Sequence, residues 1–223
     1  PAMHAFIDTE IIAKAPARYM WAGIGDTYAK YYEAKISSRD ERLEHFAAVG
    51  VAVSEMCLQP LLEYGVKAYA DHQKGLCTYD VEQVVLAIVV TTGIASIFLT
   101  KDCTPDYNSG LAHAVFYALT SYPVIEKLHL HGEVVGFGVL LALLVDRQEE
   151  EFEKIYKLNR ESGLPVSLKE IEITEDEWEE SMNRIPEMSD VAHYPYRVTK
   201  EMLRDAMDRL KERAGKDAYD TEK

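Results

Sequence analysis

The feature that most constrains the fold is the stretch from Ser109 to Leu144, which contains two apolar segments of helical composition on either side of Tyr122-Pro123. Proline disfavours a helical conformation in the residue before it, so one helix is predicted to end there and a second to begin beyond it. The second segment includes an apolar run from Val134 to Val145. Because a helix that is apolar on all sides must be covered by other elements, this run predicts a buried core helix.

A second apolar run extends from Val84 to Leu99, within a predicted helix that Asp80 caps, with Gln83 three residues later. It is apolar nearly all round, which places it at the centre of the expected fold. Both runs fall short of the roughly 18 to 20 residues that a membrane-spanning helix needs. We therefore expect core helices of a soluble protein and no membrane partner.

Helical patterns cover most of the remaining chain, and about eight helices are expected in all. Ser38-Arg39-Asp40-Glu41 and Thr174-Glu175-Asp176-Glu177 have the spacing of capping boxes. The first is predicted to begin a helix that ends near Leu58, before a break at Gln59-Pro60. The sequence thus predicts an all-α, multihelical domain.

Only the segment from Pro1 to Asp8 has the short apolar pattern of a β-strand, and one strand cannot make a sheet. We interpret residues 1–8 as the exit strand or linker of a domain that should precede them. Residues 9–214 are predicted to form the helical domain, and the charged segment 215–223 a frayed tail.

The composition excludes several functional classes. A formal net charge of −14 argues against a nucleic-acid partner, because such proteins need clustered Lys and Arg to neutralise phosphates. The cysteines Cys57, Cys77 and Cys103 are too few and too scattered for a disulfide framework or a Cys-x-x-Cys metal site. Because cysteines are so few and scattered, a reducing cytoplasm is the expected location.

Two glycine pairs begin like a dinucleotide-binding fingerprint, Gly23-Ile24-Gly25 and Gly136-Phe137-Gly138. Tyr28 stands at the third glycine position of the first pair and Leu141 at that of the second, and the segment before the first is helical. The sequence also lacks a G-x-S-x-G nucleophile motif. It therefore offers neither a phosphate-binding loop nor a covalent nucleophile.

Two histidines and one aspartate are the candidate metal ligands. His113 and His131 lie near the facing ends of adjacent predicted helices, and Asp26 can complete a three-ligand site with an open fourth position, as in catalytic zinc centres. Each residue alone has an ordinary explanation. His113 fits a hydrogen-bonded core histidine, His131 a residue at a helix terminus, and Asp26 a turn or cap residue beside two glycines.

At these residues the sequence resembles the iron-containing alcohol dehydrogenase and glycerol dehydrogenase superfamily, most of all its glycerol dehydrogenase branch. Four blocks carry the resemblance, in the family's order and with family-like separations. They are Ile7-Asp8-Thr9 with Ile12 to Arg18, then Ala22 to Asp26, then Gly110 to Ala114, and His131 to Gly138.

The resemblance implies a metal held by Asp26, His113 and His131. It also implies NAD(P)-linked oxidation of a small alcohol or polyol, in which the metal lowers the pKa of the substrate hydroxyl and the cofactor accepts a hydride. Lys30 occupies the position of a fourth histidine ligand in iron-dependent members, so Zn²⁺ is expected rather than Fe²⁺. His129 is a candidate neighbour of the ligands or proton relay.

The resemblance covers only the helical metal-binding domain of a two-domain family. It implies that the N-terminal nucleotide-binding domain is missing and that the isolated chain is inactive, and we expect the complete enzyme to be a homo-oligomer. Phe116 and Tyr117 stand where glycerol-type members tend to carry polar residues, so the substrate alcohol stays open.

Two alternative functions remain. The first is another activity of the superfamily, that of a dehydroquinate synthase-like lyase or a glycerol-phosphate dehydrogenase, for whose anionic substrates Lys30 and Lys127 are the available cations. The second is a metal-free helical interaction module.

Overall fold

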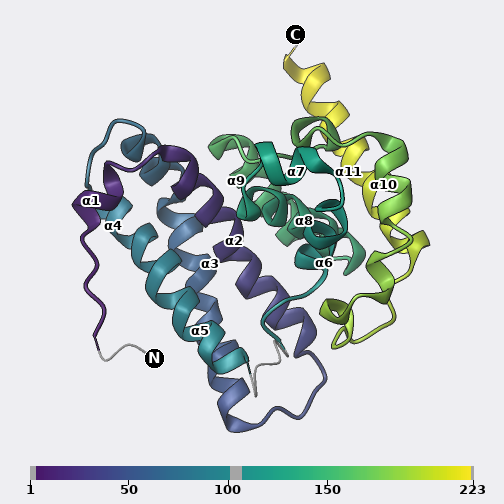
Figure 1. The fold of residues 1–223 in the computed structure, drawn as a ribbon, viewed down its shortest axis with the longest axis horizontal. Coiled ribbons are helices and arrows are strands. Elements are labelled where there is room, and N and C mark those ends of the chain that lie inside the picture. The colour runs from purple at the N-terminus through teal and green to yellow at the C-terminus, as the bar shows by residue number, and fades with distance from the viewer. Residues whose placement is uncertain (1–3, 101–106, 222–223) are drawn as a thin grey trace.

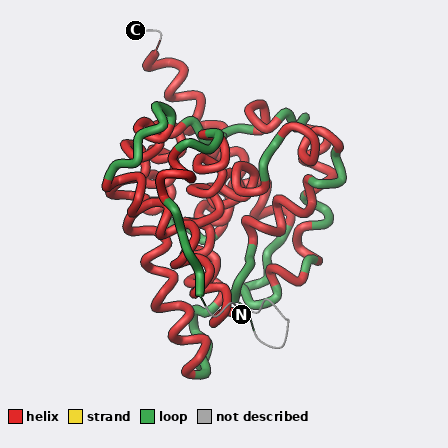
Figure 2. The backbone as a smooth tube through the Cα atoms, turned by 60° about the vertical axis from the view of Figure 1, so that its left-hand side comes forward, coloured by secondary structure: helices red, strands yellow, loops and turns green. Residues whose placement is uncertain are grey.

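The computed structural model describes residues 4–100 and 107–221. Within these ranges the chain consists of helices and connecting loops, with no β-strand (Figure 2), and the predicted all-α multihelical fold is confirmed. The α-helices are α1 (Thr9–Ala13), α2 (Ala17–Ser37), α3 (His45–His72), α4 (Tyr79–Leu86), α5 (Thr92–Leu99), α6 (Leu111–Leu119), α7 (Pro123–Leu128), α8 (His131–Val145), α9 (Glu149–Ser162), α10 (Glu175–Ser181) and α11 (Lys200–Thr221). A π-helical turn, η1 (Ala87–Thr91), joins α4 to α5, and the 3₁₀ turns η2 (Leu168–Ile171), η3 (Ile185–Glu187) and η4 (Ser189–Val191) lie between α9 and α11.

Helix α8 is the core of the molecule. Every residue from Gly132 to Val145 is buried, and α2, α6, α9 and α11 pack around the helix. Such complete coverage is what an apolar helix with no polar face requires. The predicted burial of the run from Val134 to Val145 is therefore confirmed.

Helix α2 runs between two groups of helices (Figure 1). It contacts α3 and α5 on one side and α8 on the other. Its buried residues accordingly lie all round the helix and include Ile24, Tyr28, Tyr32 and Ile36. This central position lets α2 carry polar side chains into the interior, where the candidate site lies.

The contact between α2 and α8 is made backbone to backbone. Gly25 lies against the carbonyl oxygen of Gly132, and Gly132 against the carbonyl oxygen of Ala22, so closely that a side-chain carbon at either glycine would overlap the oxygen opposite. Gly136 lies in the same seam, beside the Cα of Gly25. Gly25 and Gly136, one from each fingerprint-like pair, therefore allow close packing of two helices, and they do not form a phosphate-binding loop.

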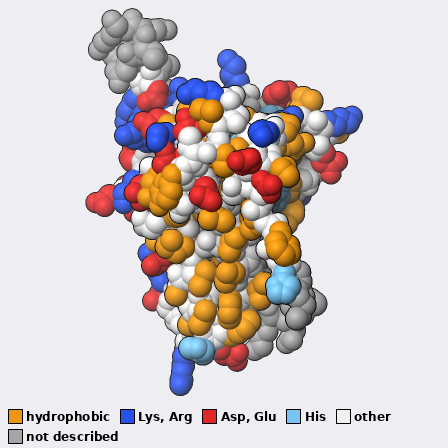
Figure 3. Space-filling view, turned by 90° about the vertical axis from the view of Figure 1, so that its left-hand side faces the viewer, with side chains coloured by type: hydrophobic (Ala, Val, Ile, Leu, Met, Phe, Trp, Pro, Cys, Tyr) orange, Lys and Arg blue, Asp and Glu red, His pale blue; other side chains and the backbone are white. Residues whose placement is uncertain are grey.

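The helix from Tyr79 to Leu99, formed without a break by α4, η1 and α5, is not at the centre of the fold, and that prediction is wrong. One side packs on α2 and α3, while Val89 is 47%, Ile94 41% and Ile97 60% exposed on the other. Figure 3 shows hydrophobic side chains gathered on this face of the molecule. A helix that is apolar all round carries no pattern that says which side is covered, so its composition alone could not place it.

Two helices are long and apolar enough to cross a membrane when judged by length and composition alone, α3 and the continuous helix Tyr79–Leu99. The second is longer than the run from Val84 to Leu99 that the sequence indicates, because it begins at Tyr79. Each helix is buried over only part of its length. Core helices of soluble proteins can be equally long and apolar.

The helix boundaries around residue 40 differ from those predicted. Helix α2 continues to Ser37, Ser38 is its C-cap, and Asp40 adopts a left-handed conformation with φ 66°. Helix α3 then begins at His45 and continues past Pro60 to His72. The packing of α3 against α2, α4 and α5 compensates for the backbone hydrogen bond that Pro60 removes. The second predicted capping box, at Thr174, is formed.

The two ends of the chain, predicted to be an exit strand or linker and a frayed tail, are a loop and the end of a helix, and the assignment of residues 1–8 to a preceding domain stays a prediction. Residues 4–8 form a loop, and Asp8 caps α1 by accepting hydrogen bonds from the backbone N–H groups of Glu10 and Ile11. With no partner strand among the described residues, no strand can form. Helix α11 continues to Thr221, so the expected tail is helical to that point. Residues 1–3 and Cys103 lie outside the described ranges.

The glycine seam, formed by Gly25, Gly132 and Gly136 between α2 and α8, yields the first prediction. Replacing Gly132 by Ala forces α2 and α8 apart and should lower the free energy of unfolding by about 3 kcal/mol, the cost of overpacking a close contact. Gly93 is the matched control, because it is also helical but has no neighbour within 4 Å of an added Cβ. Gly93→Ala should instead raise stability by about 0.5 kcal/mol. Urea unfolding of the three proteins measures both changes, and equal effects would contradict the packing argument.

Candidate metal centre

Three side chains from three helices converge on one point: Asp26 from the middle of α2, His113 from the first turn of α6 and His131 at the start of α8. The Oδ1 atom of Asp26 lies 3.6 Å from Nε2 of His113 and 3.5 Å from Nε2 of His131. All three donor atoms lie within 4.8 Å of one another. Ligands at about 2.1 Å around a tetrahedral zinc ion are about 3.4 Å apart, so the two separations from Asp26 are close to those around such an ion, and the donor types suit it.

The helix packing explains why the three side chains meet. A Cβ at Gly132 would lie 3.0 Å from the Cβ of Asp26, so the glycine seam places the start of α8 directly beside the aspartate. On another side of α8, the missing side chain of Gly138 leaves room for Ala112 in the first turn of α6. The histidine that follows Ala112 is thereby held at the same end of α8 as His131.

A buried glutamate stands behind His113. Glu33 is 0% exposed and His113 is 7% exposed. The carboxylate accepts hydrogen bonds from the backbone N–H of His113 at 2.9 Å and from its Nδ1 at 2.6 Å. Burial acts to lower the pKa of His113, but the negative charge and hydrogen bond of Glu33 outweigh it and hold the pKa above its ordinary value.

The other two side chains are open to solvent in part. The side chain of Asp26 is 36% exposed and that of His131 is 42% exposed. Burial acts to raise the pKa of Asp26, but the hydrogen bond with His131 and the charge of His113 outweigh it and hold the pKa below its ordinary value. An ionised carboxylate and two imidazole nitrogens are the donor set that a divalent metal needs.

Aromatic side chains form one wall of the site. The ring of Phe116 lies edge-on to His131 with 4.4 Å between centroids, and the ring of Tyr117 lies 6.2 Å from that of His113. Tyr117 is 48% exposed. The two residues that the sequence marks as a departure from the glycerol-type pattern therefore border the triad.

The remaining residues singled out from the sequence lie outside the triad. Lys30 is buried, and its ammonium group donates hydrogen bonds to the backbone carbonyl and side-chain oxygen of Asn108. His129 bonds through Nδ1 to Glu133 at 2.7 Å, while its Nε2 is buried with no hydrogen-bond partner among the described residues. Lys127 is exposed.

Glu33 is the residue of this site that the sequence reasoning missed. Its signal lay in the spacing of α2: Asp26, Lys30 and Glu33 follow one another at intervals of four and three residues and so share one face of the helix. Three ionisable residues on one face of a helix whose other positions are largely apolar point to a polar site in the interior.

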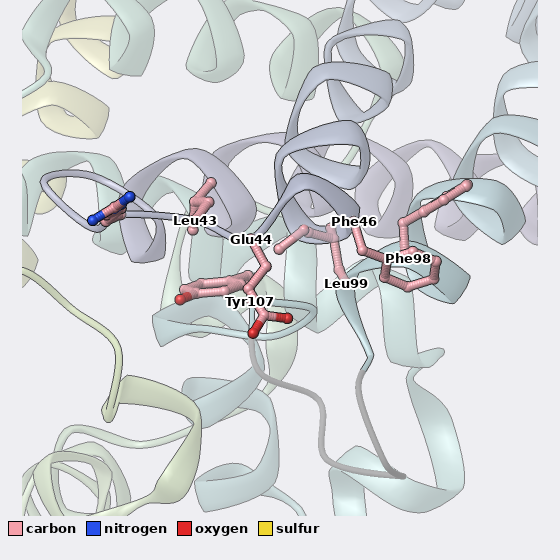
Figure 4. A pocket seen from close by; sticks show the side chains of 8 residues that line it. Leu43, Glu44, Phe46, Phe98, Leu99 and Tyr107 are labelled. Carbon is pink, nitrogen blue, oxygen red and sulfur yellow. The ribbon is translucent and has the colours of Figure 1, made fainter.

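A hollow lies away from the triad. It is formed where the start of α3 meets the end of α5, and Figure 4 shows Phe46, Phe98, Leu99 and Tyr107 lining it. Its lining contains none of the three converging side chains. Among the described residues, Asp26, His113 and His131 form the one group of His, Cys, Asp and Glu side chains close enough together to hold a metal ion.

Known proteins resemble this chain in sequence over part of their length. A glycerol dehydrogenase of Thermotoga maritima is 35% identical over 175 residues, which cover 74% of this chain and 44% of that protein. A glycerol dehydrogenase of Escherichia coli O6:H1 is 34% identical over 178 residues, 76% of this chain and 45% of that protein. The chain thus spans less than half the length of these curated relatives. No model of a protein family matches it.

Solved structures give the same relationship. A probable glycerol dehydrogenase from Sinorhizobium meliloti 1021 superposes with a TM-score of 0.76 at 28% identity, covering 91% of this chain and 57% of that one. The glycerol dehydrogenase of Schizosaccharomyces pombe has the same fold over 97% of this chain and 56% of its own, with a TM-score of 0.81 at 24% identity. The predicted resemblance to the superfamily is confirmed, and it covers the C-terminal part of those proteins.

Proposed function

We propose that this chain, which is related to the C-terminal part of the iron-containing alcohol dehydrogenases and glycerol dehydrogenases, holds the catalytic metal of an enzyme that oxidises a small alcohol or polyol with NAD(P). The observation that carries the proposal is the convergence of Asp26, His113 and His131 from three helices. The sequence relatives named glycerol dehydrogenase support the class of reaction. The helical domain, residues 9–214, would then be the metal-binding domain.

The donor set favours Zn²⁺ over Fe²⁺. Two imidazoles and one carboxylate with an open fourth position are typical of catalytic zinc. Lys30 is one helical turn from Asp26, but its ammonium group is engaged by Asn108 and, being cationic, offers no lone pair to a metal. The site therefore lacks the fourth nitrogen ligand expected of an iron-dependent member.

The chain's own residues supply binding and alignment. A zinc ion held here would lower the pKa of the substrate hydroxyl, and bound NAD(P) would accept the hydride. Asp26 and His131 are partly exposed, which leaves an approach for substrate on their side of the site. Phe116 and Tyr117 present aromatic surface beside the ligands, so they exclude water and favour an alcohol with an apolar flank.

The cofactor would be bound by another part of the complete enzyme. The described part of the chain carries no phosphate-binding glycine loop, and the curated relatives named above are more than twice as long as their matching segments. We expect a nucleotide-binding domain to close over the exposed side of the triad, in a cytoplasmic homo-oligomer. The chain by itself would bind metal and turn over no substrate.

The alternatives have less support. An anionic substrate would need free cations at the site, but Lys30 is tied to Asn108 and Lys127 is exposed on α7. A metal-free interaction module would have no reason to bring two imidazoles and an ionised aspartate together in a partly buried site, where their desolvation is costly.

Metal binding tests the proposal directly. The chain, stripped of metal and dialysed against Zn²⁺, should bind one zinc ion per molecule, measured by mass spectrometry of the eluted metal. Asp26→Asn, His113→Ala and His131→Ala should each raise the zinc dissociation constant by more than about 100-fold, since a direct ligand contributes more than a residue that orients one. His45→Ala is the control, because His45 is exposed on α3. A wild-type chain without stoichiometric zinc would favour the interaction module.

Activity provides a second, independent prediction. The 223-residue chain should give no NAD reduction with glycerol or other small polyols, because we assign the nucleotide site to another part of the complete enzyme. Fusion to the nucleotide-binding part of a glycerol dehydrogenase should restore zinc-dependent NADH formation, followed by absorbance, and His113→Ala in the fusion should abolish it. NAD-linked oxidation by the unfused chain would refute the assignment of the cofactor site to another domain.

A further inference from the structure

We propose that Glu33 is the positioning residue of the metal site: it fixes the imidazole of His113 in the tautomer whose Nε2 lone pair faces the metal. The proposal rests on the proposed function, because it takes His113 as a metal ligand. It goes beyond that function in assigning a task to a residue that touches neither the metal position nor a substrate.

The hydrogen bonds of Glu33 determine which nitrogen carries the proton. Oε1 accepts from the backbone N–H of His113 at 2.9 Å, and Oε2 lies 2.6 Å from Nδ1. A carboxylate can only accept, so Nδ1 must donate and carry the hydrogen. In a neutral imidazole the lone pair is then on Nε2. That atom is the one 3.6 Å from Oδ1 of Asp26.

The position of Glu33 is itself tightly determined. A Cβ at Gly110 would lie 3.1 Å from the Cγ of Glu33, so the glycine before α6 gives the carboxylate its space. Gly110 has no side chain to cap α6, and Glu33 instead accepts from the N–H of the third residue of that helix. The carboxylate is thus a cap supplied by another helix, at the end where a negative charge is favoured.

A second buried glutamate has nearly the same geometry at a histidine outside the triad. Glu133 accepts from the backbone N–H of Leu130 at 3.1 Å and from Nδ1 of His129 at 2.7 Å. It is 5% exposed and belongs to the capping box of α8, in which Gln is an accepted substitute for Glu. Glu133→Gln therefore makes the same chemical change beside a histidine that is not a ligand.

The substitution Glu33→Gln has a defined structural consequence. The amide oxygen of Gln must face the backbone N–H of His113, because that donor cannot change its character. The amide NH₂ then faces Nδ1, which must become an acceptor, and the proton moves to Nε2. The shape of the side chain is retained, but the lone pair that should face the metal is lost.

The experiment uses the whole chain and has two readouts besides activity. The first is the ¹⁵N chemical shift pattern of the His113 ring in the metal-free protein at about pH 9, well above the ordinary imidazole pKa. Wild type should show the Nδ1–H tautomer and Glu33→Gln the Nε2–H tautomer. The second is the dissociation constant for Zn²⁺, measured by competition with a chromophoric chelator. Glu33→Gln should weaken zinc binding by about 10- to 100-fold.

The matched variant and a folding measurement separate positioning from a general loss of structure. Glu133→Gln should leave zinc binding close to the wild-type value, and circular dichroism should show both variants folded. The proposal is overturned if Glu33→Gln is folded and binds zinc as wild type does, if its tautomer is unchanged, or if Glu133→Gln weakens binding equally. Failure of wild type to bind zinc would instead overturn the proposed function, so the two failures are distinguishable.

Discussion

The direct backbone contact between α2 and α8 is the constraint on which the rest of the structure depends. Gly25 and Gly132 each face a carbonyl oxygen of the opposite helix with no room for a side chain. This proximity lets α8 be covered completely, and it also brings Asp26 beside the first turn of α8. Core packing and the candidate metal site therefore both depend on this contact. A substitution at Gly25 or Gly132 would disturb the two together.

Two charged side chains within this apolar core are carboxylates that accept hydrogen bonds. Glu33 and Glu133 are both buried carboxylates, and each receives one backbone N–H near the start of a helix and one imidazole Nδ1. A buried carboxylate without such donors would cost several kcal/mol of stability. The hydrogen bonds that offset the cost of burying these carboxylates also fix the side-chain rotamers of His113 and His129. The site is thus held by the hydrogen bonds that the fold already needs.

Apolar runs predicted the all-α fold and the burial of α8, because they are local signals. The convergence of Asp26, His113 and His131 was expected mainly from the resemblance to the superfamily, since each residue alone has an ordinary explanation. It misplaced the helix Tyr79–Leu99, whose exposed side can be recognised only from what its neighbours leave uncovered. It also took Ser38 for a helix start, although the end of α2 and the turn at Asp40 occupy that segment. Glu33 was missed because its pairing with His113, 80 positions away along the chain, is not visible in the sequence. The spacing of Asp26, Lys30 and Glu33 on one face of α2 indicates a polar interior but not which partner Glu33 has.

The distance along the chain between α2 and α8 has a consequence for how the protein assembles. Residues Ala17–Ser37 and His131–Val145 are separated along the chain by α3 to α7, and bringing the ends of so long a segment together costs conformational entropy. Contacts between residues this far apart along the chain slow folding. Until they form, Asp26 and His131 belong to separate parts of the chain. The three side chains of the candidate metal site can therefore converge only once α2 and α8 have packed against each other.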